Sequence, residues 1–370
     1  MKSIGILTFH HTGNYGGWLQ AFALAQTLSE EGYRAEVIDY RPRKVHGKYI
    51  RNGLLSTRGF RWHLRSGAPF GQRCAGALRA VGIEYRQIVR MNRHLRELGR
   101  ASAQIASTPS SLKSISGNYD TLITGSDEVW KMKGPRCDDG SYFLNVATSK
   151  QRCISYAASC GDRSFFGDLA TRVRPWVERM DAVSVRDRNT RRIVSDEFYR
   201  NADEVVDPTW FLDPSFAGGR RLVSERYIAL LGRPFDWAVR SAVELARAKG
   251  LIAVGVGHYL PGVDRVLAGL APEEWLSVIR DAEYVVTNLY HGTLFCLRYG
   301  RPFVTACPAD KKFKIDELLS CLDLEERIVD ANSDPRVLPD ILAKRVDFED
   351  VWQRMIPGTT ASREWLLRNV

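Results

Sequence analysis

Tyr284-Val-Val-Thr-Asn-Leu-Tyr-His-Gly-Thr293 is the stretch of this chain that decides its fold. Its β-branched start predicts a buried parallel strand, and the glycine and threonine after His291 are typical of a tight turn into a helix. In an open α/β sheet, ligands bind at the carboxyl ends of the strands. Amide groups at Gly292 and Thr293 would attract an anion there, and His291 could give or take a proton. We therefore expect the chemistry at His291, and the alternative is a histidine that only caps its own helix.

Further strand and helix signals follow one another in the order typical of parallel α/β proteins. Strand signals lie at 4–9, 35–40, 121–130, 154–159, 182–187, 227–232, 251–257, 284–288 and 302–306. Helix signals lie at 18–28, 81–98, 237–248, 272–281, 315–322 and 337–352. A break with two prolines at 205–215 separates two such series. We predict an α/β fold of two Rossmann-like domains facing a cleft, the GT-B-like arrangement.

The predicted first domain covers residues 1–210 and contains a basic insertion at about 41–105. A linker at 211–225 leads to the second Rossmann-like domain at 226–335. We expect the terminal helices at 336–370 to pack back on the first domain.

Polar residues follow the strand signals of the first domain, and parallel topology would bring them to one edge of the sheet. They are Asn14, Tyr15 and Gly16 in a glycine-rich turn, Ser126 with Asp127, Ser159, and Arg186 with Asp187. Arg186 is the best anion ligand of this set, because a guanidinium matches a phosphate or carboxylate. As alternatives, Asn14 and Asp127 could be helix N-caps, and Arg186 could pair with an aspartate. Asn288 and Tyr290 complete the predicted cleft lining from the second domain.

The charge of the chain is concentrated in one segment. Residues 41–100 hold 15 Lys or Arg against only Glu84 and Glu97, whereas the net charge of the whole chain is +10. Such a patch would attract an anionic membrane surface, another polyanion or a phosphorylated acceptor. We expect peripheral contact with an anionic membrane through residues 41–100 and no nucleic-acid partner. A solvated helical insertion is the alternative.

The remaining composition is that of a globular protein with 44% hydrophobic and 26% charged residues. No run approaches the ~20 apolar residues of a membrane span, and the N-terminus does not resemble a signal peptide. The seven cysteines form no Cys-x-x-Cys pair, which favours reduced thiols over a disulfide framework. We expect a cytoplasmic protein, peripheral at the inner membrane face. Since the histidines lack ligand spacing, we expect no metal site.

With these residues in place, the chain resembles the polysaccharide pyruvyl transferase family. The resemblance rests on blocks that occur in family order between about residues 3 and 330. The blocks are Gly13-Asn-Tyr-Gly16 with Leu19-Gln20, Gly125-Ser-Asp-Glu-Val-Trp130, Ser155-Tyr-Ala-Ala-Ser159, Ser184-Val-Arg-Asp187, Asp207-Pro-Thr209, His291-Gly-Thr293, Lys314-Ile-Asp-Glu-Leu-Leu319 and Leu324-Glu-Glu-Arg327. The basic insertion lies outside this resemblance.

The resemblance implies an enzyme of cell-surface polysaccharide, or exopolysaccharide, biosynthesis. Family members transfer the pyruvyl group of phosphoenolpyruvate onto two hydroxyls of a sugar and form a cyclic ketal. The partners implied are phosphoenolpyruvate, as donor substrate rather than cofactor, and a glycan or lipid-linked oligosaccharide acceptor. No further cofactor is expected.

The resemblance also suggests roles for individual residues. Arg186 would hold the donor with the Gly292 and Thr293 amides, and His291 would act as acid. Some members place an arginine two residues before this histidine, where this chain has Leu289. One of three lysines after the last strand, Lys311, Lys312 or Lys314, would supply the missing charge. Asp127 or Asp187 would serve as base.

Two other functions remain open at this stage. A GT-B nucleotide-sugar glycosyltransferase would also place a diphosphate at the glycine-rich turns, so only the donor separates it from a pyruvyl transferase. The second alternative is a catalytically silent scaffold that binds an anionic surface through residues 41–100.

Overall fold

The computed structural model describes residues 1–43, 45–47, 69–133 and 139–370, without the side chains at 309–311. The chain forms two compact units. Unit 1 consists of residues 1–50, 91–212 and 356–370, and unit 2 consists of residues 51–90 and 213–355. The predicted basic insertion lies partly outside the description, because residues 44 and 48–68 are not covered.

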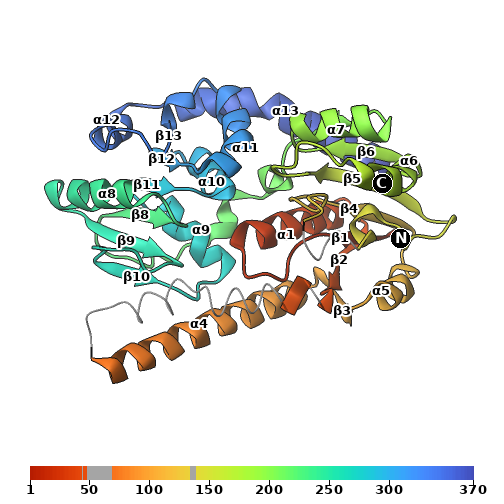
Figure 1. The fold of residues 1–370 in the computed structure, drawn as a ribbon, viewed down its shortest axis with the longest axis horizontal. Helices are drawn as coiled ribbons and strands as arrows, with labels where there is room; N and C mark the ends of the chain where they lie inside the picture. Colours follow the sequence, from red (N-terminus) through yellow and green to blue (C-terminus); the bar gives the residue numbers. More distant parts are fainter. Residues whose placement is uncertain (44, 48–68, 134–138) are drawn as a thin grey trace. The chain divides into compact units, whose positions relative to one another are not determined.

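Unit 1 is built on a seven-stranded parallel sheet in the order β3-β2-β1-β4-β5-β6-β7 (Figure 1). Its strands are β1 (Ser3–Leu7), β2 (Arg34–Tyr40), β3 (Ala101–Ala106), β4 (Thr121–Thr124), β5 (Arg152–Ala158), β6 (Ala182–Val185) and β7 (Asp203–Glu204). Its helices are α1 (Tyr15–Glu30), α5 (Pro109–Ser116), α6 (Asp168–Glu178) and α7 (Arg188–Phe198), with the 3-10 helices η2 (Ser141–Phe143) and η3 (Pro208–Phe211).

Strand β1 is the centre of this sheet, and all five of its residues are buried. Ile4 pairs with Ala35 of β2 on one side and with Thr121 of β4 on the other. The chain continues from β1 to β2 and β3 in one direction, and β4 starts the run in the other direction. The sheet therefore has a topological switch point between β1 and β4, where ligands of such folds bind.

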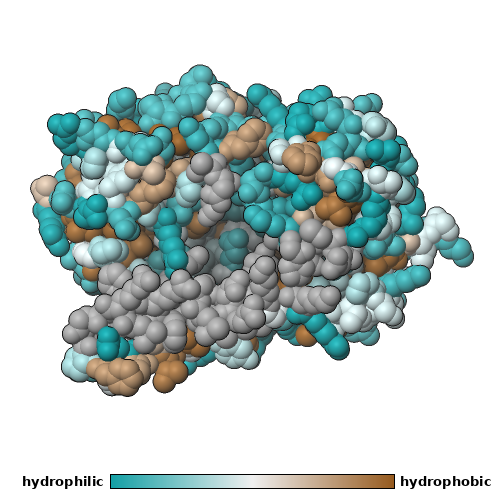
Figure 2. All heavy atoms as spheres, viewed as in Figure 1, coloured by the Kyte–Doolittle hydropathy of each residue, from teal (hydrophilic) through white to brown (hydrophobic). Residues whose placement is uncertain are grey.

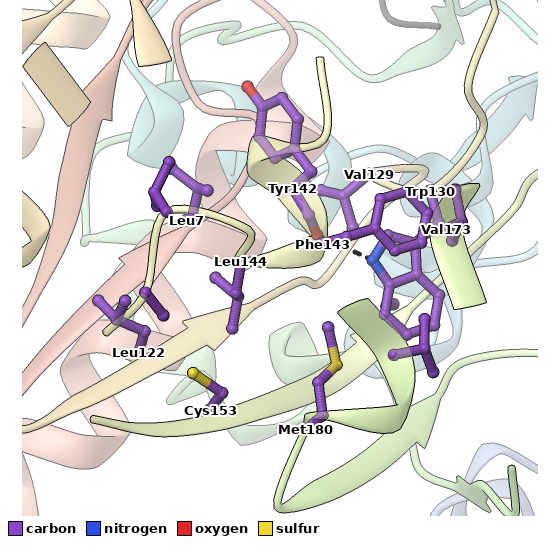
Figure 3. Close-up of a cluster of buried hydrophobic side chains, with 14 of the residues drawn as sticks. Leu7, Leu122, Val129, Trp130, Tyr142, Phe143, Leu144, Cys153, Val173 and Met180 are labelled. Carbon is purple, nitrogen blue, oxygen red and sulfur yellow. Dashed lines mark hydrogen bonds between the residues drawn. The ribbon is translucent and has the colours of Figure 1, made fainter. Parts of the chain in front are cut away.

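Aromatic side chains pack among aliphatic ones in the unit 1 core (Figure 3). Trp130 stacks on Phe143 with ring centroids 5.2 Å apart. The Trp130 indole N–H donates to the Tyr142 carbonyl at 2.9 Å (Figure 3). A buried indole is therefore paired, and the segment after β4 is fixed against η2.

Unit 2 is built on a six-stranded parallel sheet in the order β10-β9-β8-β11-β12-β13 (Figure 1). Its strands are β8 (Tyr227–Leu231), β9 (Ile252–Val256), β10 (Arg265–Leu267), β11 (Tyr284–Thr287), β12 (Phe303–Ala306) and β13 (Ile328–Val329). Its helices are α8 (Asp236–Ala248), α9 (Pro272–Arg280), α10 (Tyr290–Tyr299), α11 (Ala309–Ser320) and α12 (Val337–Ala343), with η4 (Pro214–Ala217) and η5 (Glu325–Arg327).

Two helices contribute residues to both units. Helix α4 (Phe70–Glu97) begins well before the helix predicted at 81–98, so this boundary was wrong. The helix predicted at 337–352 is two helices, α12 and α13 (Phe348–Asn369). At the end of α13, the Trp365 indole donates to Asp203 Oδ2 at 2.7 Å, so this part packs on unit 1.

Within the described residues, no helix combines the length and hydropathy that a bilayer-spanning segment requires.

Candidate functional site

The switch point of unit 2 lies between β8 and β11, which are neighbours in the sheet. From β8 the chain continues to β9 and β10, and from β11 it continues to β12 and β13 on the other side. Thr287 pairs with Leu231, so both strands end at the same level. The segments that follow, from Gly232 and from Asn288, are thus the ones placed to meet a ligand.

Asn288 ties these two segments together. Its Oδ1 accepts from the Arg233 backbone N–H at 2.8 Å, and its Nδ2 donates to the Arg233 carbonyl at 2.8 Å. The predicted role of Asn288 was in acceptor binding, but both ends of its amide bind backbone. The geometry therefore gives Asn288 a positioning contact that holds Arg233 next to Leu289.

Gly232 makes this approach possible. Its φ is +76°, and a Cβ atom at this position would overlap Asn288 Oδ1 and press on the Leu289 side chain. Gly232→Ala should lower the free energy of unfolding by about 3 kcal/mol or more, because a clash adds to the cost of the left-handed backbone. Gly250→Ala is the matched control, since Gly250 has φ +62° and open space around it.

That control should cost only the backbone term, about 1–2 kcal/mol. Urea unfolding of both variants measures the difference. Equal losses at the two positions would contradict the close approach of Gly232 to Asn288.

His291 lies in the first turn of α10, directly after β11. Thr287 Oγ1 accepts from the Leu289 N–H at 3.1 Å, and a Cβ at Gly292 would overlap this same oxygen. Helix α10 can therefore start against the end of the strand only with glycine at position 292. The His291 side chain is nearly buried, with 8% of the residue exposed, and its ring meets the Tyr290 ring edge-on at 5.2 Å.

The anion-binding role predicted for the Thr293 amide was wrong. This N–H donates to the Leu289 carbonyl at 2.9 Å, and the Thr293 hydroxyl contacts Thr305 Oγ1 at 2.9 Å. Thr293 is thus part of the hydrogen-bonded helix. The Gly292 amide, one residue earlier, has no acceptor within the helix and keeps the predicted role as a proposal.

Of the three candidate lysines, the structure brings Lys314 to this site. Its Nζ lies 5.7 Å from the centroid of the Tyr290 ring, within reach of a cation–π interaction. Lys312 is exposed, and its charge lowers the pKa of Asp316, although burial raises that pKa overall. The Lys311 side chain lies outside the described part of the chain.

Arg233 is a site residue that the sequence analysis missed. It is exposed, it follows β8, and its backbone is fixed to Asn288, next to the position where relatives were expected to carry an arginine. The signal that could have found it is a cation directly after a buried strand that ends in glycine. Sequence alone does not tell that residues 233 and 288 are in contact.

In unit 1, the switch point between β1 and β4 is held by a buried glutamine. Gln20 Nε2 donates to Thr8 Oγ1 at 2.9 Å and to the Gly17 carbonyl at 2.7 Å. Gln20 Oε1 accepts from the Ser126 N–H at 3.1 Å, and Thr8 Oγ1 donates to the Ser126 carbonyl at 2.9 Å. These hydrogen bonds join the loops after β1 and β4, and Ser126 is wholly buried among them.

Arg186 and Asp207 form a buried ion pair next to Ser126. Arg186 Nη1 lies 2.8 Å from Asp207 Oδ2, with 3% and 0% of the two side chains exposed. Asp207 also accepts from the Thr209 hydroxyl and from the Ser126 hydroxyl, at 2.7 and 3.4 Å. The alternative reading of Arg186, as the partner of an aspartate, is thus what the geometry shows.

Asp127 lies on the accessible side of this pair. Its carboxylate is 3.8 Å from Arg186 Nη2, with 16% of the side chain exposed. No helix begins at Asp127, so it is not the helix N-cap considered above. A Cβ at Gly17 would lie 3.6 Å from Asp127 Oδ2, which shows that the glycine-rich turn reaches this carboxylate.

Two other predicted residues, Asp187 and Asn14, are helix N-caps. Asp187 caps α7 by accepting from the Thr190 N–H at 2.7 Å, and its second oxygen accepts from the Ser159 hydroxyl at 2.6 Å. Asn14 caps α1 by accepting from the Gly16 N–H at 3.1 Å. Asp187 and Ser159 are buried, so the base role predicted for Asp187 does not fit its contacts. Tyr15 is buried at the start of α1.

Three histidines meet beyond the carboxyl end of β1. The His11 ring lies 5.4 Å from His10 and 5.0 Å from His46. His10 Nε2 contacts Asp39 Oδ1 at 3.1 Å. Burial, followed by the charges of His10 and His46, lowers the pKa of His11 well below its usual value. His11 is therefore a neutral, buried side chain at neutral pH.

The groove found in unit 1 does not lie at these strand ends, and the described residues form no metal site. A groove of about 500 Å³ lies beside the edge strand β3 of unit 1, lined by residues that include Arg34, Glu36 and Tyr119. Its Tyr119 hydroxyl already donates to Glu36 at 2.8 Å. Among the described residues, no group of three His, Cys, Asp or Glu side chains is placed to hold a metal ion.

Comparison with known proteins adds a family and a fold. A family model described as polysaccharide pyruvyl transferase matches residues 14–306. No curated protein sequence matches the chain. The UDP-N-acetylglucosamine 2-epimerase of Rickettsia bellii superimposes with a TM-score of 0.53 at 10% identity, covering 100% of this chain and 95% of that chain. A UDP-GlcNAc 2-epimerase of Neisseria meningitidis bound to UDP-GlcNAc gives 0.52 at 8% identity, covering 100% and 99%.

At such identities the likeness shows the fold alone. Together with the two parallel sheets, it confirms the predicted α/β class of two Rossmann-like domains with GT-B-like neighbours.

Proposed function

Because the chain belongs to the polysaccharide pyruvyl transferase family, we propose that it moves the pyruvyl group of phosphoenolpyruvate onto two hydroxyls of one glycan acceptor. The observation that carries this proposal is the position of His291, in the first turn of α10 at the switch point of the unit 2 sheet. His291 as the proposed acid and the Gly292 amide are neighbours there, and an anionic enol-phosphate donor requires an acid and hydrogen-bond donors.

The proposed reaction balances without a further reactant. A proton is added to the methylene carbon of phosphoenolpyruvate, and the adjacent carbon becomes oxocarbenium-like. One sugar hydroxyl attacks this carbon, the bond between carbon and phosphate oxygen breaks, and a second hydroxyl closes the ketal. The two hydroxyls lose one proton each. One of these protons restores the acid that protonated the methylene carbon, and the other leaves with phosphate.

We assign the donor side of this reaction to unit 2. His291 is the proposed acid, and the Gly292 amide, Lys314 and Arg233 are the proposed ligands of the donor's phosphate and carboxylate. Arg233 takes the place of the arginine absent at Leu289, since Asn288 holds its backbone beside that position. Cations aimed at a developing phosphate charge stabilise a transition state of this kind.

Asp127 keeps its predicted role as base as a proposal. Asp127 is the carboxylate that keeps some exposure, whereas Asp187 and Asp207 are committed to caps and to Arg186. Removing a proton from the attacking hydroxyl is a role for such a carboxylate. Arg186 then acts as a positioning residue, because it lies between Asp207 and Asp127.

The acceptor that we propose is a glycan or a lipid-linked oligosaccharide in cell-surface polysaccharide assembly, reached from the cytoplasmic side. The reaction needs no cofactor beyond its donor substrate. No observation on the described residues favours nucleic acid as a partner.

Thermal stability with phosphoenolpyruvate is the test of the donor. A ligand bound only by the folded chain at a hundred times its Kd stabilises it by about 2.7 kcal/mol, so the unfolding temperature should rise. Phosphoenolpyruvate should raise it in the wild-type chain, and Arg233→Ala should reduce this rise, because a donor ligand is lost. Arg240→Ala, an exposed arginine on α8, is the matched control and should leave the rise intact.

A panel of nucleotide sugars is measured beside the donor. A rise with a nucleotide sugar and none with phosphoenolpyruvate would contradict the proposal and favour a glycosyltransferase. If phosphoenolpyruvate raises the unfolding temperature equally in the wild type and in Arg233→Ala, phosphoenolpyruvate is still the donor but Arg233 does not bind it.

A further inference from the structure

Helix α4 presents three large apolar side chains to solvent on one face. Leu78, Tyr85 and Val89 are 70%, 52% and 37% exposed. Their separations of seven and four residues place them above one another on a helix. Figure 2 shows apolar residues at the surface at the lower left, where α4 begins, and Phe70 is a further exposed ring at the start of the helix. Isolated exposed apolar residues are ordinary, but three large ones on one helix face mark a candidate interaction surface.

Two arginines lie beside these apolar residues. Arg79 and Arg86 are exposed and seven residues apart, so they share a face next to Leu78 and Tyr85. Among the described residues, neither has an ion pair or a hydrogen bond. The face that holds Leu78, Arg79, Tyr85, Arg86 and Val89, here called the α4 face, is thus both apolar and positively charged.

The opposite side of the helix is anchored, so the α4 face is not a loose segment. Ala77, Ala80 and Ile88 are buried. A Cβ at Gly269 would lie 3.3 Å from Ile83, which shows how closely the helix packs on unit 2. Arg90 Nη1 lies 3.4 Å from the Gly269 carbonyl and 3.7 Å from Glu274. The α4 face is therefore the outward side of a fixed helix.

We propose that the α4 face binds the surface of an anionic lipid bilayer. A helix with cations beside exposed apolar side chains lies in the plane of such a surface, with its apolar side in the headgroup region and its charges on anionic lipid. Tyr85 is suited to this depth, because its ring is apolar and its hydroxyl stays hydrated. A nucleic acid would be bound by the arginines alone and would leave Leu78 and Val89 unused.

This surface does not depend on the proposed transfer reaction, and its test needs no substrate. The full chain is sedimented with vesicles of phosphatidylglycerol and phosphatidylcholine in equal parts, and with vesicles of phosphatidylcholine alone. The wild-type chain should bind the anionic vesicles and not the neutral ones. Arg79→Gln with Arg86→Gln should weaken binding roughly fivefold per arginine. Leu78→Gln with Tyr85→Gln should weaken it at least tenfold, in line with the apolar area lost.

Helix α8 offers a matched control. Arg240 and Arg247 are also exposed and seven residues apart in unit 2, and no large exposed apolar residue of the described chain lies on α8. Arg240→Gln with Arg247→Gln removes the same charge and should leave vesicle binding unchanged. Thermal unfolding of each double variant checks that exposed substitutions have left the fold intact.

Three results would overturn the proposal. Equal losses for the α4 and α8 arginine pairs would show that net charge alone is responsible. Full binding by Leu78→Gln with Tyr85→Gln would show that these apolar side chains do not enter the bilayer. Binding of a single-stranded RNA by the wild-type chain without binding of anionic vesicles would assign the face to nucleic acid.

Discussion

Replacing His291 by glutamine should lower turnover of phosphoenolpyruvate and acceptor by about 10²–10⁴-fold, because this is the usual contribution of a positioned general acid. Glutamine keeps most of the volume and the polar character of the nearly buried ring but cannot transfer a proton. The free energy of unfolding should therefore change little. Phosphate release, measured with a hydroxyl-rich acceptor glycan, gives the rate, and the thermal unfolding temperature reports the fold.

His258→Gln is the matched control for this experiment. His258 is also a buried histidine that follows a strand of the unit 2 sheet, after β9, and its Nδ1 contacts the Val256 carbonyl at 3.2 Å. Its replacement should leave the rate close to that of the wild type. The acid role of His291 would be contradicted by a His291→Gln variant that turns over at the wild-type rate, or by equal losses in both variants.

The architecture could be read from the sequence where the strands are short apolar runs between turn signals. The run at 284–288 became β11, and the run at 4–9 became β1, within the usual uncertainty of element ends. The strand predicted at 121–130 ends at Thr124, because Gly125 and Asp127 have positive φ and turn the chain. Buried parallel strands are predictable because both of their faces need apolar residues.

Elements at the edges of the sheets were not predictable in this way. Strand β3, with the sequence Ala-Ser-Ala-Gln-Ile-Ala, exposes three of its six residues and lacks an apolar run. The first part of α4 contains Gly71, Gly76 and Gly82, which lower helix propensity. Buried contacts of Ala77 and Ala80 stabilise the helix despite these glycines, and packing of this kind is invisible to a local pattern.

The sequence predicted where several site residues lie better than it predicted which contacts their side chains make. His291 lies where the pattern at 284–293 places it, at the end of β11. The contact between Asn288 and Arg233 joins residues far apart in the sequence, so no local sequence pattern predicts it. The cap formed by Asp187 follows from its position before α7, but its second bond, to Ser159, depends on the neighbouring strand.

Asp207 shows most clearly what a motif leaves open. The chain contains Asp207-Pro-Thr209 and Asp213-Pro-Ser215, which are alike in sequence. Both aspartates cap a 3-10 helix, by accepting from the N–H of Thr209 and of Ser215. Asp207 is buried with Arg186, whereas Asp213 is exposed. Only the tertiary structure separates a local cap from the partner of a buried cation.

Asp207→Ala should therefore lower the free energy of unfolding by about 3–5 kcal/mol, because it leaves the buried Arg186 guanidinium without the carboxylate that it contacts at 2.8 Å. Asp213→Ala removes the same cap without a buried charge and should cost about 1 kcal/mol. Urea unfolding at neutral pH measures both losses. Similar losses would show that the ion pair contributes nothing beyond the cap.

The same contact decides how activity data on Arg186 are to be interpreted. Arg186→Ala should also destabilise unit 1, because it leaves the buried Asp207 carboxylate without the cation that it pairs with. A lower turnover rate of this variant alone therefore does not make Arg186 a ligand of the donor. Arg186→Met with Asp207→Leu replaces the pair by apolar side chains of similar volume and should recover most of the stability lost in either single variant. If that double variant is stable and binds phosphoenolpyruvate as the wild type does, Arg186 serves the fold and the position of Asp127. If it is stable but no longer binds the donor, Arg186 contacts the donor directly, and its assignment as a positioning residue is wrong.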